Sequence, residues 1–77
     1  MYFEIIGGLS EIEVVAEGRS VRGRRQLRRR YGGRRWRKLK GIGTVLVANG
    51  DPRRAEVHWY EARGVGRVRY KIKRLLE

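Results

Sequence analysis

The sequence predicts an α+β fold in a single small basic domain over residues 1–77. We expect an N-terminal strand or hairpin, then one basic helix, then a three-stranded antiparallel meander. Three observations lead to this prediction: apolar and polar residues alternate towards both ends of the chain, an arginine-rich run with helical spacing lies between them, and turn-forming residues separate the runs. A chain of 77 residues has room for one small core.

The N-terminal segment predicts one strand or two paired strands. Residues 2–6 are mostly apolar, and the run Gly7-Gly8-Leu9-Ser10 is typical of a turn. In residues 11–16, Ile12, Val14 and Ala16 lie at alternate positions and would share one apolar face, which is typical of a strand with one buried face.

The basic helix is expected over residues 20–31. Ser20 is a suitable N-cap, the glycine pair after Tyr31 is a suitable stop, and Leu27 lies four residues before Tyr31 on the same face. This apolar face is narrow, and the arginines near the N-terminus oppose the helix dipole. We therefore expect packing or a bound anion to hold the helix in place.

The C-terminal half predicts three strands that follow one another in an antiparallel meander. The first is rich in β-branched residues, the second combines valine with aromatic residues, and the third alternates strictly. Glycine, asparagine and proline mark the two connections. The expected strands cover residues 42–48, 55–62 and 67–73, and the expected loops cover residues 49–52 and 63–66.

The alternation also predicts how these strands pair. A tight turn at Gly64-Val65 places Trp59 opposite Tyr70 and Val57 opposite Ile72, and puts Val68 on the same inner face. The helix and the N-terminal strands are the available cover for this face. The first hairpin is expected to pair Ile42 with Trp59, Thr44 with Val57 and Leu46 with Ala55, which adds Ile42, Thr44 and Leu46 to the inner face. The outer face is expected to carry His58, Tyr60, Arg67, Arg69, Lys71 and Lys73.

The charge of the chain is concentrated in one segment. The chain has 20 Lys and Arg against 8 Asp and Glu, a formal net charge of +12. Residues 1–17 hold four acidic residues and no basic one, whereas residues 18–50 hold twelve basic residues and no acidic one. The second segment by itself equals the net charge of the whole chain, and such a block favours a polyanionic partner.

Arginine suits phosphate contacts, and exposed aromatic rings suit stacking on unpaired bases. The sequence therefore predicts a nucleic-acid-binding protein, with RNA favoured over DNA because a basic sheet face carries Tyr60 and His58. Trp36 either stacks on a base or closes the core. The predicted binding residues are Arg24, Arg25, Arg28, Arg29, Arg30, Tyr31, Arg34, Arg35, Arg37, Lys38, Lys40, Arg67, Arg69, Lys71 and Lys73.

Two alternatives stay open. His58 and Tyr60, surrounded by basic side chains, are groups that a metal-independent, toxin-like ribonuclease could use; a structural role is the other interpretation of His58. The basic block could instead dock on an acidic protein, and the acidic residues 1–17 could shield it within one chain or between two chains of a homodimer.

Composition argues against several other classes. The chain has no cysteine, which excludes disulfides and thiolate metal sites, and a single histidine, so we expect no metal and no cofactor. The longest apolar run, Thr44 to Ala48, is far shorter than a membrane span. The acidic N-terminal segment is unlike a signal peptide. We expect a cytoplasmic protein with no membrane partner.

Three motifs carry a resemblance: RWRKLKG at residues 35–41, AEVHWYEARGVG at residues 55–66 and KIKR at residues 71–74. They resemble a family of short, basic, uncharacterised bacterial proteins over roughly residues 12–76, which implies no activity, cofactor or partner. In outline, a basic helix before a meander that ends in a basic strand is similar to RelE/ParE-type toxins, which cleave ribosome-bound messenger RNA or poison gyrase. That likeness implies the ribonuclease alternative by layout and charge alone.

Overall fold

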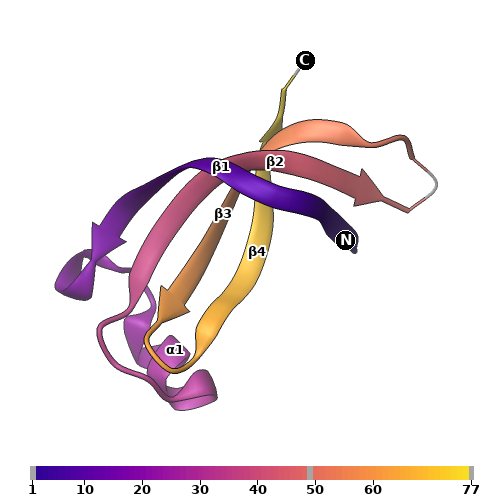
Figure 1. Ribbon diagram of the computed structural model, residues 1–77. Helices are drawn as coiled ribbons and strands as arrows, with labels where there is room; N and C mark the ends of the chain where they lie inside the picture. The colour runs from indigo at the N-terminus through magenta and orange to yellow at the C-terminus, as the bar shows by residue number, and fades with distance from the viewer. Residues whose placement is uncertain (1, 49, 77) are drawn as a thin grey trace.

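The computed structural model describes residues 2–48 and 50–76, which form one four-stranded antiparallel sheet and one short helix. The strands are neighbours in chain order, and Figure 1 shows a strongly curved sheet with the helix near the end where the third strand leads into the fourth. The elements are β1 (Phe3–Glu17), the 3-10 turn η1 (Gly18–Ser20), α1 (Arg24–Tyr31), β2 (Arg37–Val47), β3 (Arg53–Ala62) and β4 (Gly66–Leu75).

The predicted α+β fold with a three-stranded meander is wrong, because the protein is mostly β and its sheet has four strands. The N-terminal segment is one 15-residue strand that pairs with β2. The glycines that were expected to form a turn lie inside this strand, where the pairing shifts register between Ile6 and Ser10. Gly7 has φ 75°, so the chain bulges here and continues instead of reversing.

The helix is shorter than predicted. It begins at Arg24 because Gly23 adopts a left-handed conformation with φ 74° and serves as N-cap, whereas Ser20 belongs to η1. The C-terminal end agrees with the prediction: the N–H of Gly32 donates to the carbonyl of Arg28 at 2.8 Å. No helix in the described part of the chain is long and apolar enough to cross a membrane.

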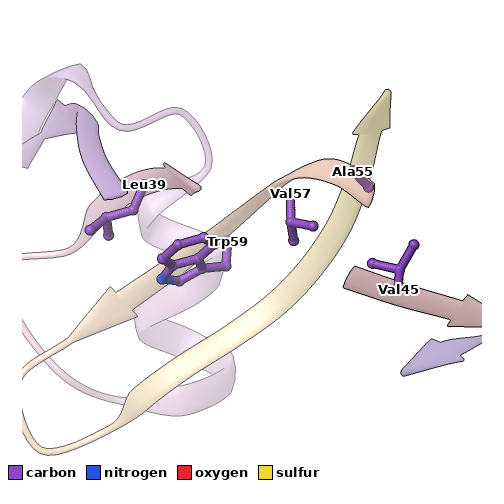
Figure 2. Close-up of a cluster of buried hydrophobic side chains, with 5 residues drawn as sticks. All are labelled: Leu39, Val45, Ala55, Val57 and Trp59. Atoms are coloured by element: carbon purple, nitrogen blue, oxygen red, sulfur yellow. The ribbon is translucent and has the colours of Figure 1, made fainter. Parts of the chain in front are cut away.

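The larger apolar cluster lies on one face of the sheet and is centred on Trp59, which is completely buried. Side chains from the N-terminal part of β1 and from β4 pack against its margin. Figure 2 shows its five buried members, which come from β2 and β3: Leu39, Val45, Ala55, Val57 and Trp59.

The predicted pairing of β2 with β3 is wrong by three residues. Leu39 lies opposite Trp59, and Gly41 lies opposite Val57. Because three is an odd number, the shift moves the expected inner residues Ile42, Thr44 and Leu46 to the other face. Two glycines on the inner side of β2 make room for bulkier neighbours: a Cβ at Gly41 would lie 3.1 Å from the Trp59 ring, and one at Gly43 would lie 2.6 Å from Leu9.

A second apolar cluster lies on the opposite face. Successive side chains of a strand point to opposite faces, so Tyr60 and Ala62 face away from the Trp59 cluster. The helix packs here through Leu27, and Trp36 is 2% exposed, in agreement with a core position. The expected helical cover of the Trp59 face is therefore wrong, because α1 covers the other side. The buried residues of this cluster are Val21, Leu27, Trp36 and Ala62.

The pairing of β3 with β4 agrees in part with the prediction. Val57 lies opposite Ile72 as expected, but nearer the turn Tyr60 lies opposite Val68. A bulge between these pairs holds Arg69 with φ 60°, and it puts Val68 on the face that α1 covers. Trp59 and Tyr70 are consequently not directly paired, although their ring centroids lie 5.6 Å apart.

The two connections have different lengths from those expected. Ala62 pairs with Gly66, which leaves a three-residue loop in place of a two-residue turn. Residues 48–52 separate β2 from β3, and Asn49, which the sequence assigns to this loop, lies outside the described residues.

Candidate nucleic-acid interface

The structure divides the arginine-rich segment into two parts. In the part that lies in the sheet, Arg37 forms an ion pair with Glu61 and Lys40 lies 3.9 Å from Glu13. Burial raises the pKa of Glu61, but hydrogen bonds from Arg37 and Trp59 outweigh it and leave that pKa below its ordinary value. Arg37 and Lys40 are therefore less available to an outside anion than the sequence suggested.

The part in and around α1 is exposed. None of its arginines forms an ion pair with a carboxylate within residues 2–48 and 50–76. No acidic residue exists between residues 18 and 50 that could neutralise them locally. The predicted binding residues in this exposed part are Arg24, Arg25, Arg28, Arg29, Arg30, Arg34 and Arg35.

Some of these arginines surround a hollow of about 380 Å³ between η1, α1 and the segment that leads into β2. Arg19 also lines it, although it is absent from the predicted set. In the sequence, Arg19 is marked as a possible binding residue only by its place in the segment without acidic residues. Its distance along the chain from residues 34–36 does not show that η1 lies beside them. The residues around the hollow are Gly18, Arg19, Arg24, Arg28, Arg34, Arg35 and Trp36.

A second hollow, of about 430 Å³, lies on the sheet. It brings together most of the residues expected on the outer face, and it adds Lys38, whose Nζ lies 5.9 Å from the centroid of the Tyr60 ring. We call this hollow the sheet groove. It is lined by Lys38, His58, Trp59, Tyr60, Arg69, Tyr70, Lys71 and Lys73, of which Lys38, Arg69, Lys71 and Lys73 carry the positive charge.

Tyr31 connects the helix to the sheet groove. Arg69 donates from Nε to the Tyr31 hydroxyl at 3.4 Å, and its guanidinium lies 5.7 Å from the ring centroid. The hydrogen bond from Arg69 holds the pKa of Tyr31 below its ordinary value, with a smaller contribution from Arg30. Tyr60 packs with the cluster under α1, so the helix and the groove share one face.

Arg67 lies away from this surface. It pairs with Glu61 at 3.6 Å and lies 5.1 Å above the Trp59 ring, on the opposite face of the sheet. The turn loop and the bulge around Arg69 set this orientation, so Arg67 is not part of the sheet groove.

His58 lines the sheet groove but is poorly placed for proton transfer. Its Nε2 lies 2.7 Å from Glu56, which also accepts a hydrogen bond from Arg74 at 2.9 Å. Its Nδ1 is buried and has no hydrogen-bond partner within the described residues. The bond with His58, followed by the one from Arg74, keeps the pKa of Glu56 below its ordinary value. This geometry favours a structural role for His58.

The described residues contain no group of three or more His, Asp or Glu side chains that could hold a metal ion. Comparison with known proteins found no matching family model, curated protein or solved structure. The resemblance to short basic bacterial proteins and the outline likeness to RelE/ParE-type toxins therefore stay predictions.

Proposed function

We propose that the protein binds nucleic acid, with RNA favoured over DNA, through one basic face made of α1, the loop after it and the sheet groove. The observation that carries the proposal is that the exposed arginines of the helix and the basic groove share this face and meet where Arg69 contacts Tyr31. A polyanion on this face could contact both sets of cations at once.

Both parts of the face suit a phosphate backbone. Exposed guanidinium groups make charge-assisted hydrogen bonds to phosphate oxygens, and each phosphate that is neutralised releases a counterion. Tyr31 and Tyr60 are half-buried, so part of each ring remains accessible for contact with an unpaired base. This combination supports single-stranded RNA as the favoured ligand.

The test is the salt dependence of binding by the full chain to RNA and DNA of the same sequence, each single- and double-stranded. We expect the log of the association constant for single-stranded RNA to fall linearly with the log of salt concentration, by about 0.7 for each phosphate neutralised and several units in total. A slope near zero, or no binding to any of the four ligands at low salt, would contradict the proposal.

Two arginines of β4 provide a matched pair of variants. Arg69→Gln removes a charge from the proposed face, whereas Arg67→Gln removes the same charge from the opposite face. We expect the first to lower affinity by about tenfold at low salt, since a charge-assisted contact is worth about 1.5–3 kcal/mol, and the second to change it by less than about twofold. Equal losses would mean that net charge, and not this face, determines binding.

A further inference from the structure

Five arginines converge on the hollow between η1 and α1. They come from three stretches of chain: Arg19 follows β1, Arg24 and Arg28 lie one turn apart on the helix, and Arg34 and Arg35 follow the helix. All five are exposed, and they line the same hollow of about 380 Å³.

The backbone holds these stretches together. The N–H of Gly18 donates to the carbonyl of Trp36 at 3.1 Å, which brings η1 beside the start of β2. Trp36 Nε1 donates to the carbonyl of Gly32 at 3.2 Å, which attaches the loop after the helix to the buried indole. The convergence of the arginines therefore follows from fixed contacts of the core.

Two features of this region are unfavourable for the folded protein by itself. Arg35 has φ 58°, a left-handed conformation that costs a residue with a side chain about 1–2 kcal/mol. The first turn of α1 holds no acidic residue, and its N-cap makes no side-chain hydrogen bond, so the positive end of the helix dipole adds to the arginine charges. No carboxylate of residues 2–48 and 50–76 forms an ion pair with any of the five arginines. The positive charges of these arginines therefore repel one another, and a bound anion would reduce that repulsion.

We propose that this hollow binds a cluster of linked phosphates, and that its ligand is the 5′-terminal triphosphate of an RNA chain. An internal phosphodiester brings one negative charge to such a volume, whereas a terminal triphosphate brings several within the reach of five guanidinium groups. The choice of RNA as the source rests on the proposed function, because the sheet groove would hold the chain that continues from this end. Free tripolyphosphate carries the same chemistry without the chain.

The experiment measures binding of the full chain to one single-stranded RNA with either a 5′-triphosphate or a 5′-hydroxyl, labelled at its 3′ end, at a fixed salt concentration. We expect the triphosphate form to bind at least tenfold more tightly. The variant Arg24→Gln with Arg28→Gln should remove this preference.

The matched control is Arg25→Gln with Arg29→Gln, which removes the same charge from the same helix but from residues outside the hollow. It should lower the affinity for both RNAs and keep their ratio. Thermal unfolding of each variant establishes that it folds.

Failure of this inference is distinguishable from failure of the proposed function. Equal binding of both RNAs by the wild type would overturn the terminal-phosphate site and leave nucleic-acid binding intact. If neither RNA binds, both the proposed function and the assignment of an RNA end to the hollow are overturned. Tripolyphosphate alone then tests the hollow: a rise in melting temperature that the Arg24/Arg28 variant lacks would support a clustered-phosphate site, and no rise in the wild type would overturn it.

Discussion

Arg69, at the bulge of β4, donates a hydrogen bond to the hydroxyl of Tyr31, the last residue of α1. The two residues are far apart in the chain, and the contact joins the two basic parts of the proposed interface. Arg69 makes it from a left-handed backbone conformation, with φ 60°. Glycine would adopt this conformation without strain, so a strained arginine here is typical of a position that serves a function.

The first prediction separates stability from binding at this position. Arg69→Gly relieves the backbone strain and loses the contact with Tyr31, so we expect the free energy of unfolding to stay within about 1 kcal/mol of the wild type or to rise. RNA affinity should still fall about tenfold. Urea unfolding and fluorescence anisotropy measure the two quantities, and a variant that is strongly destabilised would show that Arg69 is mainly structural.

A second prediction concerns the ionisation of Tyr31. The hydrogen bond from Arg69 is the main cause of its lowered pKa, so Arg69→Gln should raise that pKa towards the ordinary value of 10.0. The tyrosinate absorbance of the wild type minus that of a Tyr31→Phe variant isolates this group during an alkaline titration. An unchanged titration in Arg69→Gln would mean that the two side chains do not interact in solution.

The third prediction tests the packing of β2. Gly41→Ala would place a Cβ 3.1 Å from the Trp59 ring and 3.2 Å from the Ser10 carbonyl oxygen, and backbone cannot move away as a flexible side chain can. We expect a loss of about 1–3 kcal/mol in the free energy of unfolding. Gly8→Ala is the control, since a Cβ there meets nothing within 4 Å and the backbone is not left-handed. Equal effects of the two substitutions would contradict the register of β1, β2 and β3 described above.

The fourth prediction is loss of stability in acid. The pKa values of Glu56 and Glu61 are both lowered from 4.5, so the unfolded chain takes up protons before the folded one as the pH falls. The stability that these carboxylates contribute is fully present above about pH 4.5 and is lost as the pH falls through their folded-state values. Urea unfolding between pH 6 and pH 2.5 measures this loss.

Glu61→Gln and Glu56→Gln should each make stability less dependent on pH in that range. Glu17→Gln removes an exposed carboxylate that lies outside these ion pairs, and it is the matched control. If all three variants keep the slope of the wild type, the ion pairs with Arg37 and Arg74 do not contribute in solution.

The fifth prediction concerns the ribonuclease alternative. Because one nitrogen of His58 is engaged by Glu56 and the other is buried, we expect the wild type not to cleave RNA, either free or on ribosomes. His58→Ala should lower the free energy of unfolding by roughly 1 kcal/mol through the lost hydrogen bond. Cleavage that disappears in this variant would establish the enzyme and overturn the structural role.

Local patterns predicted strands and a helix end, but not their assembly. The alternation in residues 67–73 identifies a strand, and it correctly places Ile72 opposite Val57. The alternation could not show the bulge at Arg69, since a bulge adds one residue without changing the composition. The bulge reverses the face of each residue between Arg69 and the turn. The same limit applies to Gly7 and Gly8, which as a pair are typical of a turn and here bend a continuous strand.

The candidate site was predictable to a similar degree. The unbroken run of basic residues showed that α1 and its surroundings would be strongly cationic, because no local acid could neutralise them. It could not show that Arg37 would meet Glu61 across a strand pair, nor that Arg19 would join Arg34 and Arg35 around one hollow. These relations depend on residues distant in the chain.

The sequence by itself determined the sign and the concentration of charge, the absence of cysteine chemistry and the presence of amphipathic strands, since these are properties of composition and of local spacing. The tertiary structure alone decided which face of the sheet the helix covers, which arginines are paired and which converge. The physical reason is that strand register and bulges follow from packing: Trp59 needs the space above Gly41, and Val68 reaches the cluster under α1 only because the chain bulges at Arg69.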